Sequence, residues 1–375
     1  MASKSSNDRL GKLAQKLKTQ KLDQSIMIGF DGYVDSLYGV IHKKSGTEKQ
    51  LFKDISGFAD HIKGLSGKSG QVELSLKEIK IGGNSPIMSQ AMGALGFQVH
   101  CLGTLGFPKI LPVFEDLNPN IQVHSLENPG QSDAFEFQDG KLIFSDCGSF
   151  DDFNWKKIKE RIGLDELKKI YLGSHLVAAV DWVNLPHASN IWQGLLEEIV
   201  KPNGSIGKKF FFDLCDPSRK SNEEIREALQ IISRYSEFGE VTLGLNENET
   251  NLVFEALEYP GKKESSTEEK GKAIFDNLTI ACLLIHPVNR SFAITQKGVV
   301  EVAGKLVEEP NILTGGGDNF NAGYVLGCLL DLEMKERLLL GMGCSGAYIQ
   351  NGKSPDLSEL SQYLESWMER RKERG

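Results

Sequence analysis

The sequence contains no run of roughly 18 apolar residues, the length that crosses a bilayer as a helix. Its first stretch, MASKSSNDRLGKLAQKLKTQKL, is rich in lysine and lacks the apolar core of a signal peptide. We expect a cytoplasmic protein whose leading amphipathic helix packs on the protein's own surface. Attachment of that helix to a membrane surface is the alternative, but its apolar residues are few and small: Leu10, Leu13, Leu17 and Leu22.

Cysteine pairs and an excess of positive charge are also missing. The cysteines form no C-x-x-C pair and mostly lie in apolar stretches, which predicts reduced, buried thiols rather than disulfides or a zinc site. They are Cys101, Cys147, Cys215, Cys282, Cys328 and Cys344. The formal net charge of −8 argues against nucleic acid as a partner, because binding to its backbone needs a concentrated basic surface.

Short β-rich runs alternate with helical patterns along most of the chain. The clearest runs are SIMIGF (25–30), FQVHCLG (97–103), KIYLGSHLV (169–177), KKFFFDLCD (208–216), EVTLGLN (240–246) and TIACLLIH (279–286). Apolar residues at helical spacing occupy 86–96, 188–200, 221–235 and 358–371, and Ser221 with Glu224 forms a capping box. The alternation predicts an α/β fold with a mostly parallel central sheet flanked by helices.

One region breaks this rhythm. DAFEFQDGKLIFSD (133–146) reads as two alternating strands joined by Asp139-Gly140, a dipeptide suited to a type I′ hairpin turn. With the polar stretch from about Tyr38 to Leu76, it is expected to form a small β lid. No linker rich in Pro, Gly and Ser separates a second domain, so we expect one domain over 1–375 with lid segments at approximately 36–76 and 121–148.

The stretch ILTGGGDNFNAGYVLGCLL (312–330) places three glycines and a carboxylate at the entrance of an apolar helix. Glycines let an anion approach the unpaired N–H groups of a helix N-terminus, so Gly315, Gly316 and Gly317 are predicted to cradle a phosphate. Asp318 would repel that phosphate unless it orients and deprotonates an attacking hydroxyl. The alternative is that Asp318 is only a favourable acid in the first helical turn.

Two earlier segments carry polar residues where open α/β sheets bind ligands. IGFDGYVDSL places Asp31 and Asp35 after an apolar strand, and IGGNSPIMSQAMGALG opens a helix with Gly82, Gly83 and Asn84. We expect these five residues to bind the acceptor substrate. Either aspartate alternatively caps a turn.

LNENET presents Asn246 and Glu249 three residues apart at a strand-to-helix transition. This spacing by itself favours an N-cap residue with its returning glutamate. The chemical alternative is that the pair holds a hydrated Mg²⁺ and phosphate oxygens, since Mg²⁺ needs few protein carboxylates.

The order of these segments resembles the ribokinase-like (PfkB) carbohydrate kinase family, from about Ile26 to the C-terminal region. TGGGDNFNAG is similar to that family's D-T-x-G-A-G-D-x-F-x-x-G signature, although Ile312 and Leu313 stand where the signature has Asp-Thr. The resemblance implies a three-layer ribokinase-like fold, with Asp318 as catalytic base and Gly315 to Gly317 as anion hole. It also implies Mg²⁺ held through Asn246 and Glu249, the latter through water.

The resemblance further implies a nucleotide site and a substrate site. FFFDLCDPSRKS is similar to the family's D-x-N-x-R strand end, which implies that Asp213, Asp216 and Arg219 lie near the site. His286 replaces a conserved motif position and is expected to contact phosphate or ribose, or else to pack against Pro287. The other nucleotide contacts implied are Asn246, Thr314, Gly317, Ser345 and Asn351.

The implied activity is transfer of the γ-phosphoryl of ATP to a hydroxyl of a small sugar or polyol, with Mg²⁺. A nucleoside kinase is the first alternative, with Tyr33 or Phe30 stacking on the base. An ADP-dependent sugar kinase is the second, because GGNSPIM weakly resembles its glycine loop. The third is a catalytically silent protein that binds a sugar or nucleotide. The expected assembly is a monomer or homodimer.

Overall fold

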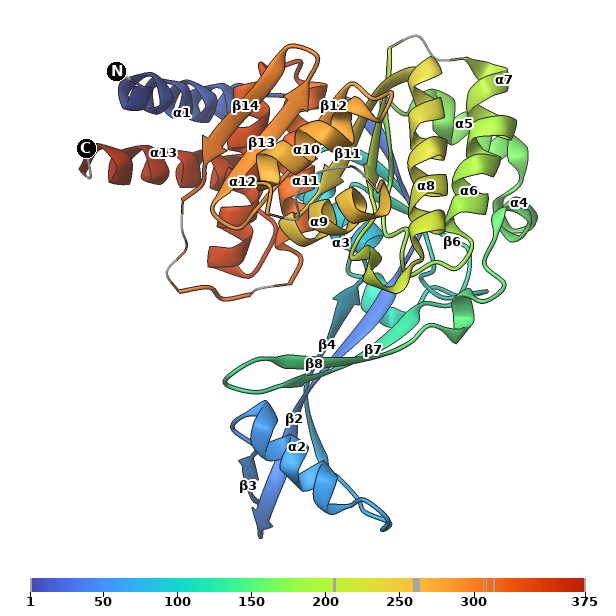
Figure 1. Cartoon of the computed structure of the whole chain (residues 1–375), viewed down its shortest axis with the longest axis vertical. Coiled ribbons are helices and arrows are strands. Elements are labelled where there is room, and N and C mark those ends of the chain that lie inside the picture. The colour runs from blue at the N-terminus through green and yellow to red at the C-terminus, as the bar shows by residue number, and fades with distance from the viewer. Residues whose placement is uncertain are drawn as a thin grey trace.

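The computed structural model describes residues 2–204, 207–258, 264–305, 307, 309–312 and 314–373. Figure 1 shows a layered body from which a small sheet projects, with the N-terminal and C-terminal helices side by side. Leu313, one of the two departures from the kinase signature, lies outside the described residues. No helix in the described ranges is both long and apolar enough to cross a membrane.

A nine-stranded sheet forms the centre of the body, in the order β14-β13-β12-β11-β10-β9-β1-β5-β6. Its strands are β1 (Ser25–Gly29), β5 (Gln98–Gly103), β6 (Ile121–Ser125), β9 (Leu176–Ala179), β10 (Lys208–Asp213), β11 (Gly239–Leu245), β12 (Cys282–Ile285), β13 (Arg290–Thr295) and β14 (Gly298–Ala303). All pairs are parallel except those made by β13 and β14 at one edge. The mostly parallel sheet predicted from the sequence is therefore confirmed.

Helices cover both faces of this sheet, because its central strands are apolar on both sides. In β10, Phe210 and Phe212 pack into one core and Phe211 into the other. The first core lies under α4 (Trp155–Ile162), α5 (Leu164–Gly173), α6 (Ala188–Leu195), α8 (Asn222–Arg234), α9 (Glu247–Ala256) and α10 (Thr267–Asp276). The second lies under α1 (Ala2–Thr19), α3 (Asn84–Leu95), α11 (Gly316–Leu329), α12 (Met334–Asn351) and α13 (Leu357–Glu373).

Two sequence-based expectations about the body are confirmed and one is wrong. The leading helix α1 packs on α13 through its buried leucines, and the cysteines are free thiols in the structure. The run 169–177 is not one strand, because residues up to Gly173 complete α5 and only 176–179 form β9. Its residues Ile170 and Tyr171 are apolar because they pack the buried face of a helix.

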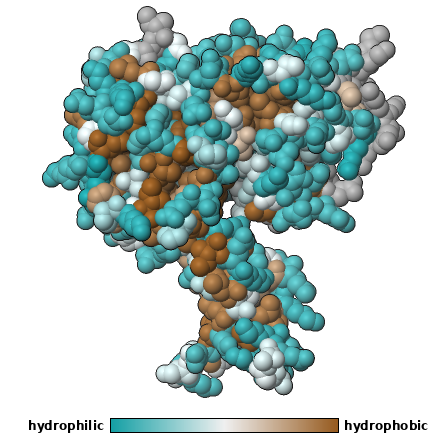
Figure 2. Space-filling model, turned by 180° about the vertical axis from the view of Figure 1, so that it is seen from behind, coloured by the Kyte–Doolittle hydropathy of each residue, from teal (hydrophilic) through white to brown (hydrophobic). Residues whose placement is uncertain are grey.

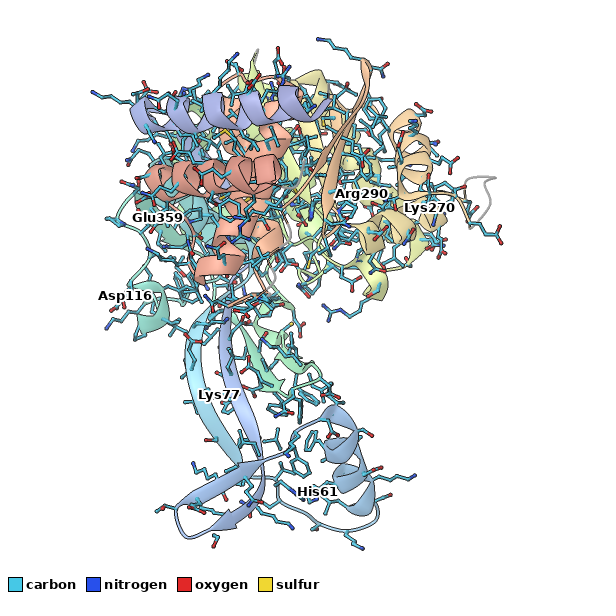
Figure 3. All side chains as sticks on the ribbon, turned by 90° about the vertical axis from the view of Figure 1, so that its left-hand side faces the viewer. His61, Lys77, Asp116, Lys270, Arg290 and Glu359 are labelled. Atoms are coloured by element: carbon cyan, nitrogen blue, oxygen red, sulfur yellow. The ribbon has the colours of Figure 1, made fainter. Side chains whose placement is uncertain are left out.

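The projecting sheet is the predicted lid, built on the long strand β2 (Tyr33–Ser45). Strand β2 pairs with β4 (Leu74–Gly82), with β3 (Glu48–Leu51) and with β7 (Gly130–Glu136), and β7 pairs with β8 (Lys141–Asp146). Helix α2 (Ile55–Gly64) covers the far end, where Val40, Phe52 and Phe58 form a small core. Figures 2 and 3 show this sheet standing clear of the body.

The lid differs from its prediction in two details. Neither Asp139 nor Gly140 has a positive φ, so the turn of the β7-β8 hairpin is not type I′. The Asp139 carboxylate instead accepts a hydrogen bond from the Ile55 N–H, 3.0 Å away, which ties the turn to α2. The second lid segment was also predicted to begin too early, because residues 121–125 are β6, an edge strand of the large sheet.

Candidate active site

Polar side chains gather where five neighbouring parallel strands end, in the order β12, β11, β10, β9 and β1. Each follows or closes its strand: His286, Asn246, Asp213, Asp181 and Asp31. The carboxyl ends of parallel strands share one edge of the sheet, which is where open α/β folds bind ligands. This edge is the candidate active site.

The glycine loop at the N-terminus of α11 is held against this edge. Gly315 has φ +86°, and a Cβ there would come within 2.7 Å of the Tyr348 hydroxyl, which donates to the Thr314 carbonyl at 3.0 Å. Gly317 is different, because the nearest atom to a Cβ there is Cε1 of His286 at 3.7 Å. The protein's own packing therefore requires glycine at 315, while Gly317 leaves open, exposed space in front of the helix N-terminus.

Asp318 follows this loop and is buried in the first turn of α11. Its Oδ1 has no hydrogen-bond partner among the described residues. Burial, with the nearby carboxylates of Asp213 and Asp31, raises the pKa of Asp318 well above its usual value, and a hydrogen bond from the Asn84 side chain opposes that rise. An unpaired buried carboxyl oxygen beside an open glycine loop is costly unless a ligand completes the site.

Asp31 holds the second glycine loop in place. Its Oδ2 accepts from the Asn84 N–H and its Oδ1 from the Ser85 N–H, both at 2.8 Å, so it caps the start of α3. Gly83 has φ +88°, and a Cβ there would lie 2.5 Å from the Asp31 Oδ2. Asp31 therefore has a capping role, and its hydrogen bonds position Gly82, Gly83 and Asn84 at the site.

Asp181 is a site residue that the sequence reasoning missed. It is wholly buried with φ +55°, its Oδ1 accepts from the Asn184 amide at 2.6 Å, and its Oδ2 has no partner in the described chain. Burial raises the pKa of both Asp181 and Asp31; the neighbouring Asp31 raises the pKa of Asp181 further, whereas the interaction with Asp181 opposes the rise for Asp31. Asn184 also accepts a hydrogen bond from Arg219. The available signal was an aspartate directly after the apolar run LVAAV.

Asp35 reaches the site from the lid strand β2. A Cβ on Gly82 would lie 2.3 Å from its Oδ1, so the paired strand β4 packs tightly on this carboxylate. Burial raises the pKa of Asp35 to about 6, while Lys80 and Lys141 oppose the rise. Burial raises the pKa of Tyr348, and the charges of Asp318 and Asp35 raise it further, so both carboxylates lie in the neighbourhood of this tyrosine.

Asn246 and Glu249 form the capping box of α9, as their spacing indicates. The Glu249 Oε2 accepts from the Asn246 N–H at 2.7 Å, and the Asn246 Oδ1 accepts from the Glu249 N–H at 2.9 Å. Glu249 is nevertheless buried, and burial with the charges of Asp213, Asp216 and Asp318 raises its pKa well above its usual value. A capping glutamate is ordinarily exposed to solvent. Glu249 instead adds a buried carboxylate to the cluster of Asp213, Asp216 and Asp318.

Three of the remaining predicted nucleotide residues, His286, Ser345 and Thr314, lie at the glycine loop. His286 is partly buried beside Phe320 with ring centroids 4.7 Å apart, burial lowers its pKa, and its Nε2 has no partner in the described chain. The Ser345 Oγ lies 3.5 Å from the Cβ position of Gly316, and Thr314 is exposed beside the loop. Asn351 is exposed at the end of α12.

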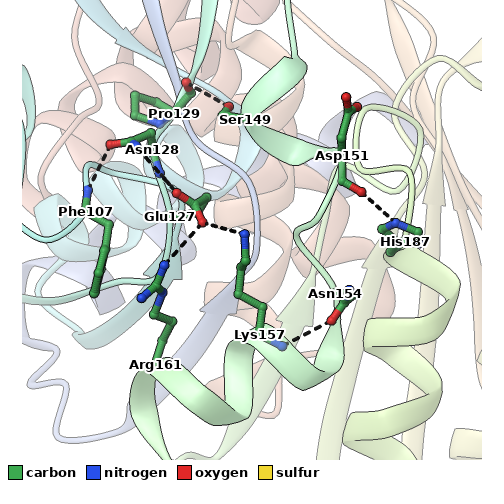
Figure 4. A network of polar contacts seen from close by, with 10 residues as sticks. All are labelled: Phe107, Glu127, Asn128, Pro129, Ser149, Asp151, Asn154, Lys157, Arg161 and His187. Carbon is green, nitrogen blue, oxygen red and sulfur yellow. Dashed lines mark hydrogen bonds and ion pairs between the residues drawn. The ribbon is translucent and has the colours of Figure 1, made fainter.

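A polar network fixes the chain where it enters the lid (Figure 4). The nearly buried Glu127 pairs with Lys157 at 3.0 Å and Arg161 at 3.6 Å, and the Arg161 guanidinium lies 3.6 Å from the Phe107 ring centre. Burial acts to raise the pKa of Glu127, but these partners hold it below its usual value. The segment leading into β7 is thereby anchored to α4.

A row of acids at the strand ends, a glycine-rich helix entrance and a small β lid are the features of a ribokinase-like fold, which by itself does not fix the substrate. The chain belongs to the prokaryotic ketohexokinase family, whose model matches residues 4–367. It is 24% identical over 351 residues to a ketohexokinase of Haloferax volcanii, covering 92% of each chain. The enzyme class and family predicted from the sequence are confirmed.

Solved structures agree on the fold. An Arabidopsis thaliana ribokinase complexed with ribose and ATP is 14% identical with a TM-score of 0.64, covering 92% of this chain and 99% of that one. An adenosine kinase from Sinorhizobium meliloti is 15% identical with a TM-score of 0.63, covering 92% and 99%. The three-layer fold with a small lid sheet is thus shared across sugar and nucleoside kinases.

Proposed function

We propose that this protein is a ketohexokinase that moves the γ-phosphoryl group of ATP to a hydroxyl of a ketohexose. The observation that carries the proposal is the buried Asp318, whose Oδ1 lies unpaired beside the open face of the glycine loop in a chain of this family. The relative from Haloferax volcanii bears the name ketohexokinase, which supports a ketohexose as acceptor.

Asp318 aligns the attacking hydroxyl and receives its proton. An aspartate is a far weaker base than an alkoxide, so the proton moves late and most of the rate enhancement comes from positioning and charge neutralisation. The N–H groups of Gly315, Gly316 and Gly317 face the charge that develops on the moving phosphoryl group. Thr314, Ser345, His286 and Asn351 flank the nucleotide.

A divalent cation fits the acidic cluster around Glu249. Like charges this close are stable together only with a proton or a cation among them, and Mg²⁺ takes oxygen ligands while keeping several waters. Glu249 and Asn246 would hold the hydrated ion, and it would supply charge neutralisation to the phosphates. In the described chain no three His, Cys, Asp or Glu side chains are grouped so as to hold a metal by themselves, so phosphate and water oxygens would have to supply the other ligands.

The acceptor sugar is proposed to lie between the lid and the strand ends. Each oxygen of Asp31 already accepts one N–H of α3, whereas the Asp181 Oδ2 has no partner in the described chain, so Asp181 and the lid residue Asp35 are proposed as the main acceptors for sugar hydroxyls. Asn84 adds a side-chain amide on the Asp318 side. Closure of the lid over the sugar would exclude water, which otherwise competes as acceptor.

The aromatic residues considered for a nucleoside acceptor do not favour that alternative. Phe30 is 1% exposed and Tyr33 is 6% exposed. The Tyr33 ring packs edge-on against Phe150, with centroids 5.3 Å apart, and its hydroxyl contacts the Cys147 thiol at 3.1 Å. Neither ring offers a free face on which a base would stack.

The experiment that tests this function is a matrix of ATP, GTP and ADP against fructose, other ketohexoses, aldohexoses, ribose, sugar phosphates and adenosine. Mass spectrometry identifies any phosphorylated product, and NMR locates the phosphate. We expect turnover only with a nucleoside triphosphate, and the greatest kcat/KM with ATP and a ketohexose. Preference for ADP, or for an aldose or nucleoside, would reject the assignment, and binding without any product would support the silent alternative.

A further inference from the structure

A cavity of about 510 Å³ lies on the opposite edge of the sheet from the candidate active site. It opens where β10, β11 and β12 begin, beneath the turn of the β13-β14 hairpin and against the second half of α11. Apolar side chains form most of its wall, among them Phe211, Val300, Val325 and Met334. The proposed kinase chemistry uses none of these residues.

One cation in the wall of this cavity forms no ion pair within the described residues. The half-buried Arg337 donates from Nε to the Leu332 carbonyl at 2.8 Å and from Nη1 towards the Cys328 thiol at 3.6 Å. Burial acts to lower the pKa of this guanidinium, and the Cys328 thiol, the Tyr324 hydroxyl and the charge of Glu240 raise it, but no carboxylate of the described chain forms an ion pair with it. A buried guanidinium is rarely left without an anion.

The acids around the cavity are already committed to other cations. Lys209 lies between Glu240 at 3.4 Å and Asp331 at 3.3 Å, and Glu333 pairs with Arg9 of α1 at 2.5 Å. The exposed Lys297 adds a further positive charge at the mouth. The cavity wall itself carries the cations Lys209, Lys297 and Arg337 against the acids Glu240 and Glu333, so its charge is positive by one and lies next to apolar side chains.

We propose that this cavity binds a small amphiphilic monoanion, a carboxylate carrying an apolar chain or ring. The carboxylate pairs with Arg337, and the apolar part lies against Val300 and Val325. The cavity wall includes Tyr324 and Cys328 of α11, the helix whose other end carries Asp318. The ligand is distinct from the sugar and the nucleotide, so the site exists whether or not the proposed acceptor is right.

The test uses octanoate as probe and 1-octanol as its uncharged counterpart, each titrated into the full chain by calorimetry. We expect octanoate to bind the wild-type protein and to bind Arg337→Gln about tenfold or more weakly, the loss typical of one charged hydrogen-bonded pair. Lys335→Gln, which removes a cation of the same helix outside the cavity wall, is the matched control and should bind as wild type.

A second variant keeps the test decisive if Arg337→Gln folds poorly. Val300→Trp fills the cavity from the half-buried strand β14 and should abolish octanoate binding while circular dichroism and thermal unfolding stay close to wild type. The proposal is overturned if octanoate does not bind the wild-type protein, if either cavity variant binds it as well as wild type, or if 1-octanol binds equally tightly.

Discussion

The carboxylates proposed to carry the chemistry differ in their surroundings. Asp318 is buried in the glycine loop with one oxygen unpaired, whereas Asp35 lies on the lid near two lysines. The first is placed to act on a hydroxyl, and the second to bind one. Each placement makes its own prediction.

Replacement Asp318→Asn should lower kcat by roughly a hundredfold or more, because it removes the proton acceptor while keeping the shape of the side chain. Nucleotide affinity should stay the same or improve, since a negative charge beside the phosphates is lost. Steady-state kinetics and calorimetry measure the two effects. Asp331→Asn, at the other end of α11, is the control and should have wild-type kinetics; near wild-type turnover of the Asp318 variant would remove that residue from its role.

The pH dependence of sugar binding tests Asp35. Because its pKa is raised to about 6, Asp35 is mostly protonated below pH 6 and ionised above it. A carboxylate accepts stronger hydrogen bonds from sugar hydroxyls than a neutral acid does. The KM for the sugar should therefore fall about tenfold from pH 5 to pH 7, following the ionised fraction. Asp35→Asn should flatten this part of the profile; an unchanged slope in that variant would contradict the assignment.

At the scale of the element, the glycines at the N-terminus of α11 have different roles. Gly315 is required by the packing of the protein itself, whereas Gly317 is proposed to leave room for a bound phosphate. Gly317→Ala meets no atom closer than 3.7 Å, so thermal unfolding should stay near wild type while the Cβ obstructs a bound phosphate. We expect ATP affinity to fall at least tenfold, measured by calorimetry.

Gly315→Ala is the matched comparison within the same loop. Its φ of +86° and its 2.7 Å approach to the Tyr348 hydroxyl should destabilise the protein itself by roughly 1 kcal/mol or more. If Gly317→Ala bound ATP as tightly as wild type, the loop would not be the phosphate site.

The capping box of α9 gives a second test at this scale. Glu249→Gln keeps a hydrogen-bonding side chain at the cap but removes a buried charge, so the Mg²⁺ concentration for half-maximal activity should rise several-fold. Glu224→Gln alters the equivalent box of α8, whose glutamate is exposed, and should leave the Mg²⁺ titration unchanged. Equal titrations for both variants would favour the purely structural role of Glu249.

At the scale of the whole molecule, the lid presents an unpartnered apolar face. Ile79 pairs with Ser36, Ser36 pairs with Asp133, and Asp133 pairs with Phe144, so the side chains of Ile79 and Phe144 lie on one face of the sheet. Leu76 pairs with Tyr38, two residues beyond Ser36 on β2, and therefore lies on the same face. Ile79 and Leu76 are each 53% exposed, and Phe144 is 57% exposed. Asp35 and Leu37 lie on the opposite face, so the exposed apolar face points away from the sugar.

We expect this face to be covered by the same face of a second copy, because a two-fold axis pairs identical apolar patches. Light scattering should give twice the mass of one chain for the wild type and a single-chain mass for the double variant Ile79→Lys, Phe144→Lys. Ile143→Lys, 57% exposed on the opposite face beside Ala134, is the control and should remain a dimer. A single-chain mass for the wild type at high concentration would favour the monomer.

The sequence by itself was enough to derive the layers, the lid and the entrance of α11. The spacing of apolar residues indicates which faces of the helices and strands are buried. The three glycines and the acid at the start of α11 lie within one helical turn, so this feature is visible in residues that are adjacent in the chain. The capping boxes of α8 and α9 were predictable for the same reason.

Only the tertiary structure decided which distant residues meet. Asp31 and Asp181 are 150 positions apart, and they become neighbours because β1 pairs with β9, an order set by the packing of whole strands rather than by local sequence. The same packing buries Glu249 next to Asp213 and leaves Arg337 facing an apolar cavity. Burial and the approach of like charges depend on three-dimensional contacts, and for that physical reason the pattern of residues along the chain does not contain them.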